Sequence, residues 1–113
     1  MARYQALRSQ REFDRVYTKG RRVSGPFFSF HALRISPQEP TRFGIIIGLK
    51  VSKSAVIRNK KKRQIKEIIR EEYSLIQSGY WCSIIVYPTI LEAEYTELQK
   101  ALHISMQRAQ ILL

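Results

Sequence analysis

The sequence is poor in the residues that build disulfides, metal sites and acid–base catalysts. It contains one cysteine, Cys82, and two histidines, His31 and His103, in 113 residues. A single cysteine cannot form an internal disulfide, and zinc sites normally take several Cys or His ligands. We interpret Cys82, inside the apolar run "WCSIIVY", as a small buried hydrophobe in a reducing compartment. We therefore expect no metal site in the protein itself.

Long hydrophobic segments are also missing. The first residues, "MARYQALRSQREF", contain no apolar core of the kind found in signal peptides. No later segment approaches the roughly 20 apolar residues that a membrane-spanning helix needs. These absences predict a cytoplasmic protein that does not enter a membrane.

Acidic residues are scarce relative to basic ones. Twenty Lys and Arg stand against nine Asp and Glu, which gives a formal net charge of +11. Eighteen of the 20 basic residues lie in residues 1–73, so the excess is not a uniform coat. Such a balance implies a polyanionic partner, with nucleic acid as the first candidate and an acidic membrane surface as the second.

The length of 113 residues predicts one domain, residues 1–113. Because 44% of the residues are hydrophobic, this domain can bury a small core. Ser9 and Glu12 have the spacing of a capping box, which predicts a helix that ends at Gly20. Strands are predicted in 25–35 and 42–51, where the run Ile45–Ile47 suggests burial on both faces.

The second half of the chain continues with a helix, a strand and a helix. Residues 55–73 have helical periodicity, and 80–88 form an apolar run that ends at a proline. Thr89 and Glu92 repeat the capping-box spacing, which predicts that the final helix starts there. The order α-β-β-α-β-α, with an antiparallel pair and a βαβ crossover, indicates an α+β protein, a two-layer α/β sandwich.

The stretch "AVIRNKKKRQIKEIIREEY", Ala55–Tyr73, combines two faces. An apolar stripe of Ile65, Ile68, Ile69 and Tyr73 can pack on the sheet. A second face gathers polar and basic side chains at helical spacing: Asn59, Lys62, Arg63, Lys66 and Arg70. Like charges four residues apart cost a few tenths of a kcal/mol per pair, which is reasonable if a polyanion lies along this face. A merely solvated basic face is the alternative, and double-stranded nucleic acid stays open.

Aromatic residues near this basic excess suggest unpaired bases, because bases stack on aromatic rings. The residues concerned are Phe13, Tyr17 and Phe27. The alternative for each of them is an ordinary place in the core.

Three segments together resemble a known family, the protein component of bacterial ribonuclease P. They are "FDRVYTKG" (Phe13 to Gly20), "GIIIGLKVSK" (Gly44 to Lys53) and "RNKKKR" (Arg58 to Arg63). Their order and spacing match the family from about Leu7 to Leu102. A basic run by itself would be much less specific than a basic run placed before an isoleucine stripe.

The resemblance implies a sandwich with a left-handed βαβ crossover and a role as the protein subunit of ribonuclease P. One protein would bind one catalytic RNA, which with Mg²⁺ hydrolyses the phosphodiester bond, so no residue of the protein is catalytic. It implies that the catalytic RNA is bound by Lys50, Lys53, Arg58, Asn59, Lys60, Lys62, Arg63 and Lys66. It also implies that the single-stranded 5′ leader of precursor tRNA is bound by Phe13, Tyr17, Phe27 and His31.

The chain departs from the family pattern at the entry to the basic helix. Lys60 replaces an arginine, which keeps the charge and loses the planar fork. Lys61 stands where the family usually has an aliphatic residue, so the helix packs less there or the lysine extends its amine to the surface. Ser54 resembles one extra residue, which predicts a loop of different shape.

Two other functions fit parts of the sequence. A self-sufficient nuclease would need a His pair or a carboxylate cluster, and neither pattern is present. A ribosomal-type structural protein or RNA chaperone without a catalytic partner fits the composition equally well, and only the order of the motifs argues against it.

Overall fold

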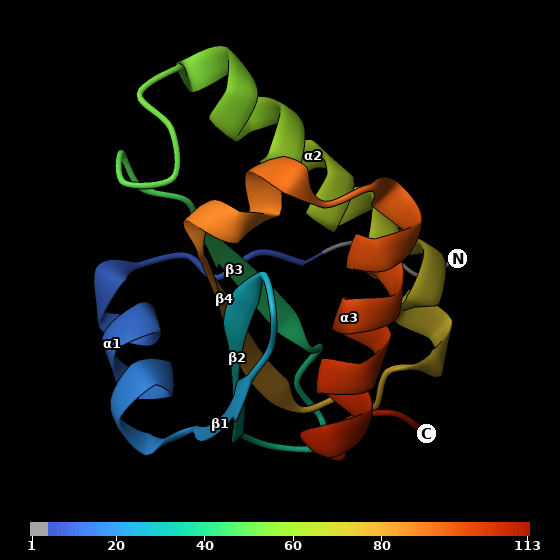
Figure 1. Cartoon of the computed structure of the whole chain (residues 1–113). Helices are drawn as coiled ribbons and strands as arrows, with labels where there is room; N and C mark the ends of the chain where they lie inside the picture. Colours follow the sequence, from blue (N-terminus) through green and yellow to red (C-terminus); the bar gives the residue numbers. More distant parts are fainter. Residues whose placement is uncertain (1–4) are drawn as a thin grey trace.

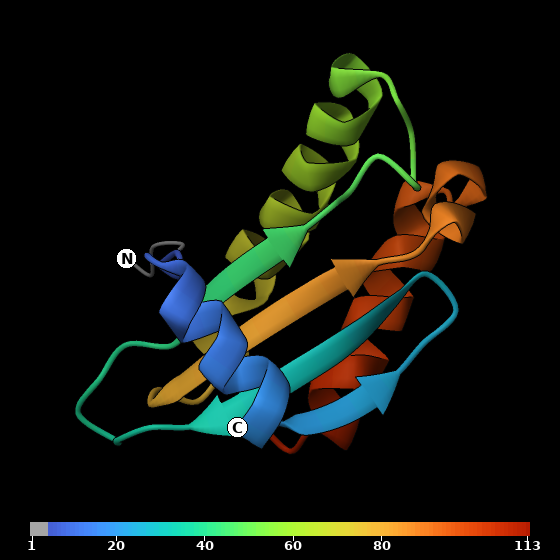
Figure 2. The ribbon, with the colours of Figure 1, turned by 90° about the vertical axis from the view of Figure 1, so that its left-hand side faces the viewer.

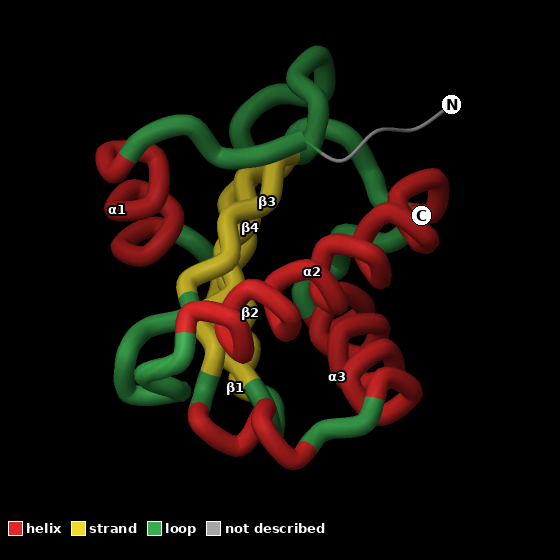
Figure 3. The backbone as a smooth tube through the Cα atoms, turned by 90° about the horizontal axis from the view of Figure 1, so that it is seen from above, coloured by secondary structure: helices red, strands yellow, loops and turns green. Residues whose placement is uncertain are grey.

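A mixed sheet separates one helix from two others in the computed structural model, which describes residues 5–113. Figures 1 and 3 show α1 on one face of the sheet and α2 and α3 on the other. The helices and strands are α1 (Gln10–Lys19), β1 (Arg21–Ser24), β2 (Phe28–Arg34), β3 (Arg42–Ile46), α2 (Ala55–Glu72), β4 (Tyr80–Val86) and α3 (Tyr95–Arg108). Two short 3₁₀ turns, η1 (Tyr73–Leu75) and η2 (Pro88–Glu92), complete the order.

The strand order in the sheet is β1-β2-β4-β3. β2 pairs with β4 in antiparallel register, and β3 pairs with β4 in parallel register through the crossover helix α2. In Figure 2, with β3 and β4 pointing up, β3 lies to the left of β4 and α2 passes behind them. This is a left-handed crossover, opposite to the usual hand of such units. The predicted α+β sandwich and its left-handed crossover are confirmed.

Two details of the sheet differ from the prediction. β1 is not predicted from the sequence, because "RRVS" has one apolar residue and no alternation of polar and apolar residues. It forms a strand because its backbone pairs with β2. The two strands predicted as neighbours, β2 and β3, are separated by β4. Such an arrangement depends on the path of the later chain, which local patterns do not encode.

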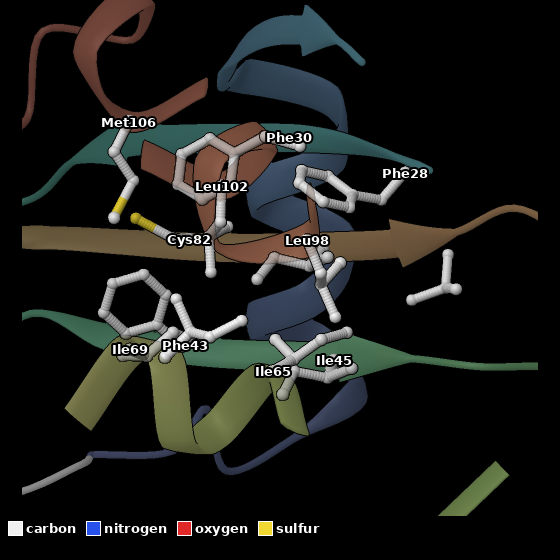
Figure 4. Close-up of a cluster of buried hydrophobic side chains, with 14 of the residues drawn as sticks. Phe28, Phe30, Phe43, Ile45, Ile65, Ile69, Cys82, Leu98, Leu102 and Met106 are labelled. Atoms are coloured by element: carbon white, nitrogen blue, oxygen red, sulfur yellow. The ribbon is translucent and has the colours of Figure 1, made fainter. Parts of the chain in front are cut away.

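The core lies between the sheet and the pair α2 and α3 (Figure 4). In that view Ile65 and Ile69 of α2 approach β3, and the α3 side chains lie over β2 and β4. The predicted stripe of α2 is fully buried at Ile65, Ile68 and Ile69. Cys82 is buried as predicted, and burial raises the pKa of its thiol, so it is an unreactive core residue.

The observed N-termini of α1 and α3 can be compared with the two predicted helix starts. Ser9 caps α1 and accepts a hydrogen bond from the Glu12 N–H at 3.3 Å, as predicted. The predicted start of the last helix at Thr89 is wrong, because the Thr89 hydroxyl donates to the Pro26 carbonyl at 2.6 Å and η2 occupies that stretch. α3 starts at Tyr95, with a capping box formed by Glu94 and Glu97.

The run Ile45–Ile47 is not buried on both faces. Ile45 is in the core, but β3 ends at Ile46, whose side chain is 40% exposed. The face of β3 that carries Ile46 is the α1 face, and α1 does not reach it. The consequence is an uncovered area of sheet beside α1.

Candidate RNA interface

The basic residues of α2 lie on a helix whose start projects beyond the sheet (Figures 1 and 2). Ser54 caps this helix and accepts a hydrogen bond from the Ile57 N–H at 3.3 Å. The residue that was predicted to reshape the loop is therefore the N-cap. Val56, in the first turn, is 79% exposed, so this end of α2 is not packed on the rest of the protein.

The structure groups the predicted contacts to catalytic RNA on α2 and the loop before it. Exposed members are Lys50, Lys53, Asn59, Lys60 and Arg63, and partly buried members are Arg58, Lys62 and Lys66. Arg58 also orders the loop, since its guanidinium donates to the Ser52 carbonyl at 2.8 Å. The first turn of α2 contains no acidic residue, so the positive end of the helix dipole reinforces the positive side chains.

Lys61 points toward the body of the protein. Its ammonium donates to the Ala93 carbonyl at 3.1 Å, which joins α2 to η2. Burial, followed by the charge of Lys60, lowers the pKa of Lys61. The two predicted alternatives for Lys61 were looser packing of the helix and an amine that extends to the surface; the amine instead ends on a backbone carbonyl of the protein.

The other candidate surface is the flank of α1 that carries Phe13 and Tyr17. Val16 is fully buried against the sheet, whereas Tyr17 is 62% exposed. Phe13 is held by Gly44 on β3: a Cβ at residue 44 would lie 2.2 Å from the Phe13 ring. Only glycine lets the ring sit this close to the strand, so Gly44 positions α1.

Beneath Tyr17 lies a buried polar cluster. His31 is 2% exposed and its ring centroid is 5.4 Å from that of Tyr17. Its Nε2 is 3.0 Å from the Ser29 hydroxyl, while its Nδ1 and the Ser83 hydroxyl on the neighbouring strand have no hydrogen-bond partner among residues 5–113. Burial, and then the charge of Arg22, lowers the pKa of His31. His31 therefore lies beneath Tyr17 in surroundings that disfavour its protonated form.

The sheet continues past Tyr17 without a helix above it. Figure 2 shows that α1 crosses in front of the first parts of β3 and β4 and leaves the ends of both strands uncovered. By strand alternation, Ile46 and Ile85 face this area. Tyr87 follows β4, and hydrogen bonding to its oxygen, chiefly from Ser24, lowers its pKa. A flat, partly apolar floor beside an exposed aromatic ring suits unpaired bases.

Phe27 does not join the other three predicted leader contacts. It packs against the core with Val23 and lines a hollow between the β1–β2 turn and α3. The prediction that Phe27 contacts the leader stays a prediction, but its surroundings differ from those of Phe13, Tyr17 and His31.

Several residues of this surface were not singled out in the sequence. Ser83, Ile85 and Tyr87 lie in or just after an apolar run, "YWCSIIVYP", that looks buried on both sides. Only the strand register, which places Ser83 opposite His31 and Ile85 opposite Ser29, shows which side chains point toward α1.

Residues 5–113 offer no group of three His, Cys, Asp or Glu side chains placed to hold a metal ion. The two histidines are in different layers: His31 lies in β2, and the Nδ1 of His103 on α3 is 2.5 Å from Glu72 of α2. None of the helices in this part of the chain has the length and apolarity to cross a bilayer. Together, a left-handed α+β sandwich, a basic crossover helix and an open aromatic surface point to the class of RNA-binding proteins.

Comparison with known proteins gives the particular family. The family model described as Ribonuclease P matches residues 1–110. The ribonuclease P protein component of Microcystis aeruginosa is 37% identical over 109 residues, covering 94% of this chain and 91% of that protein. That of Symbiobacterium thermophilum is 32% identical, with the same two coverages of 94% and 91%. The chain belongs to the ribonuclease P protein family.

Solved structures support the fold. The Staphylococcus aureus RNase P protein has a TM-score of 0.87 at 23% identity, covering 98% of this chain and 100% of that one. The Thermotoga maritima RNase P protein has a TM-score of 0.82 at 23% identity, covering 92% of this chain and 96% of that one.

As a member of the ribonuclease P protein family, the chain is a protein component of an endoribonuclease ribonucleoprotein that processes tRNA, and its partners include RNA.

Proposed function

We propose that this chain is the non-catalytic subunit of its ribonuclease P, one copy per catalytic RNA, acting in the cytoplasm. The basic residues of α2 and its preceding loop bind the catalytic RNA. The surface beside Tyr17 binds the single-stranded 5′ leader of precursor tRNA. The observation that carries this proposal is the separation of the two surfaces by the sheet, because one small domain can then hold two RNAs at once.

Each surface has chemistry suited to its proposed ligand. Cations on α2 neutralise phosphates irrespective of sequence and release counterions. Tyr17, Phe13 and the floor around Ile85 offer stacking and apolar contact, which unpaired bases accept and paired bases do not. Precursor tRNA and mature tRNA differ in the leader, so this surface favours substrate over product.

The chemical step belongs to the RNA in this proposal. Among residues 5–113, no three His, Cys, Asp or Glu side chains are grouped so that they could hold a metal ion. We assign the Mg²⁺ ions to the catalytic RNA. The protein's contribution is to raise the affinity for substrate and to screen the repulsion between two polyanions.

Reconstitution tests the proposal. Protein purified free of RNA should not cleave precursor tRNA, whereas protein with its cognate catalytic RNA should cleave it at Mg²⁺ concentrations too low for the RNA alone. Cleavage by the protein alone would contradict the assignment of catalysis to the RNA. Tight binding to many structured RNAs with no stimulation of cleavage would instead favour the structural RNA-binding or chaperone function.

A further inference from the structure

Three basic residues of α1 have no role in the proposed function. Arg11, Arg15 and Lys19 are exposed and spaced by four residues, so they form one row along the helix, here called the α1 basic stripe. Consecutive members are about 6 Å apart along the axis. At about 100° per residue, the stripe lies on the side of α1 opposite to Phe13 and Tyr17.

The stripe keeps an excess of positive charge, because its three cations stand beside only two carboxylates of α1, Glu12 and Asp14. In residues 5–113 none of its three cations forms an ion pair with a carboxylate. The acidic residues of α1 are engaged elsewhere: Glu12 accepts from the Arg8 backbone N–H at 2.6 Å, and Asp14 accepts from the Gln10 amide at 2.9 Å. Like charges four residues apart destabilise a helix, and α1 has only ten residues. An external anion along the stripe removes this repulsion.

One member of the stripe is held in place by the sheet. The guanidinium carbon of Arg15 lies 5.7 Å from the ring centroid of Trp81, at the start of β4. A guanidinium held over an aromatic ring is restricted in its motion, and its N–H donors can still bind two oxygens of a phosphate. Arg15 therefore presents an ordered phosphate-binding group, at lower entropic cost than a mobile side chain.

We propose that the α1 basic stripe is a second binding surface for the phosphate backbone of the catalytic RNA; this rests on the proposed function. The segment that precedes α1 lies beside β3, since the Leu7 N–H donates to the Phe43 carbonyl at 3.1 Å. α2 packs on the other face of the same strand, where Ile69 lies beside Phe43 (Figure 4). An RNA that wraps the β3 edge of the sheet reaches both basic surfaces, and the leader keeps the opposite side of α1.

The test compares two triple variants with the same loss of charge. One removes the stripe (Arg11→Gln, Arg15→Gln, Lys19→Gln). The control removes three exposed cations from β2 and α3 (Arg34→Gln, Lys100→Gln, Arg108→Gln). Each protein is titrated with the catalytic RNA over a range of salt concentrations, with thermal unfolding measured in parallel. The stripe variant should bind at least about ten-fold more weakly at low salt, with a log–log salt slope shallower by about two, relative to the control.

Two results would overturn the inference. Equal slopes for stripe variant and control would show a general charge effect. A loss confined to the ratio of precursor to mature tRNA affinity would mean that the stripe serves the leader.

A double variant that keeps Arg15 (Arg11→Gln, Lys19→Gln) should lose less affinity for the catalytic RNA than the triple variant. It remains informative if the triple variant does not fold. Failure of the proposed function would appear differently, as a parent protein that does not bind the RNA at all.

Discussion

At the scale of single residues, a mutation at Tyr17 tests whether its ring binds the substrate or packs in the core. Its ring is mostly exposed, while Val16 beside it carries the contact with the sheet. Base–aromatic stacking is worth about 1–3 kcal/mol per base, so Tyr17→Ala should weaken holoenzyme binding to precursor tRNA by roughly ten-fold. Affinity for mature tRNA and the melting temperature should barely change. An equal loss for both tRNAs would place the leader elsewhere.

His31 makes stability depend on pH in a definite direction. Its pKa is lowered by burial and by Arg22, so on acidification the unfolded chain takes up this proton before the folded one. The free energy of unfolding should therefore fall as the pH drops through about 6.5, the ordinary value for histidine. Urea unfolding between about pH 8 and pH 5 measures this slope. His31→Gln should flatten it; a parent protein that gains stability on acidification would contradict the assignment.

At the scale of elements, the close contact between Phe13 and Gly44 helps to position α1 on the sheet. An added Cβ at Gly44 would meet the Phe13 ring at 2.2 Å and Leu7 at 2.9 Å. Gly44→Ala should cost about 1–3 kcal/mol, as overpacking does, and should displace α1 from the sheet. Adding Phe13→Ala should recover part of that loss, because it removes the clash. A double-mutant cycle by urea unfolding measures the coupling, and strictly additive losses would show that the two residues do not interact.

The two faces of α2 predict two different mutant behaviours. Arg63 is exposed and Ile68 is fully buried. Arg63→Ala should weaken binding to the catalytic RNA and make its salt slope shallower by about one, without loss of stability. Ile68→Ala should instead cost about 2–5 kcal/mol of stability, as cavities in cores do. Unfolding of the Arg63 variant would show that the faces are wrongly assigned.

At the scale of the whole molecule, the formal charge of +11 affects the free protein. Like charges repel one another in the compact state, and salt screens that repulsion. Raising NaCl from about 20 mM to about 200 mM should therefore raise the melting temperature of the free protein, while it weakens binding to the catalytic RNA. A melting temperature that falls with added salt would mean that favourable ion pairs dominate.

The sequence by itself determined the features that depend on residues close together in the chain. The capping of α1 by Ser9, the buried isoleucines of α2 and the exposed basic residues beside them depend on spacings within one helix, where periodicity and side-chain chemistry suffice. The excess of positive charge and the motif order indicated RNA and the family without any contact being known.

The tertiary structure decided what depends on residues far apart in the chain. The insertion of β4 between β2 and β3 set the register that puts Ser83 opposite His31 under Tyr17. The pairing of "RRVS" with β2 made a strand from a segment without a strand pattern. The same geometry placed Phe27 beside α3 and stacked Arg15 on Trp81. These contacts join segments whose local sequences carry no information about one another, so only packing of the whole chain brings them together.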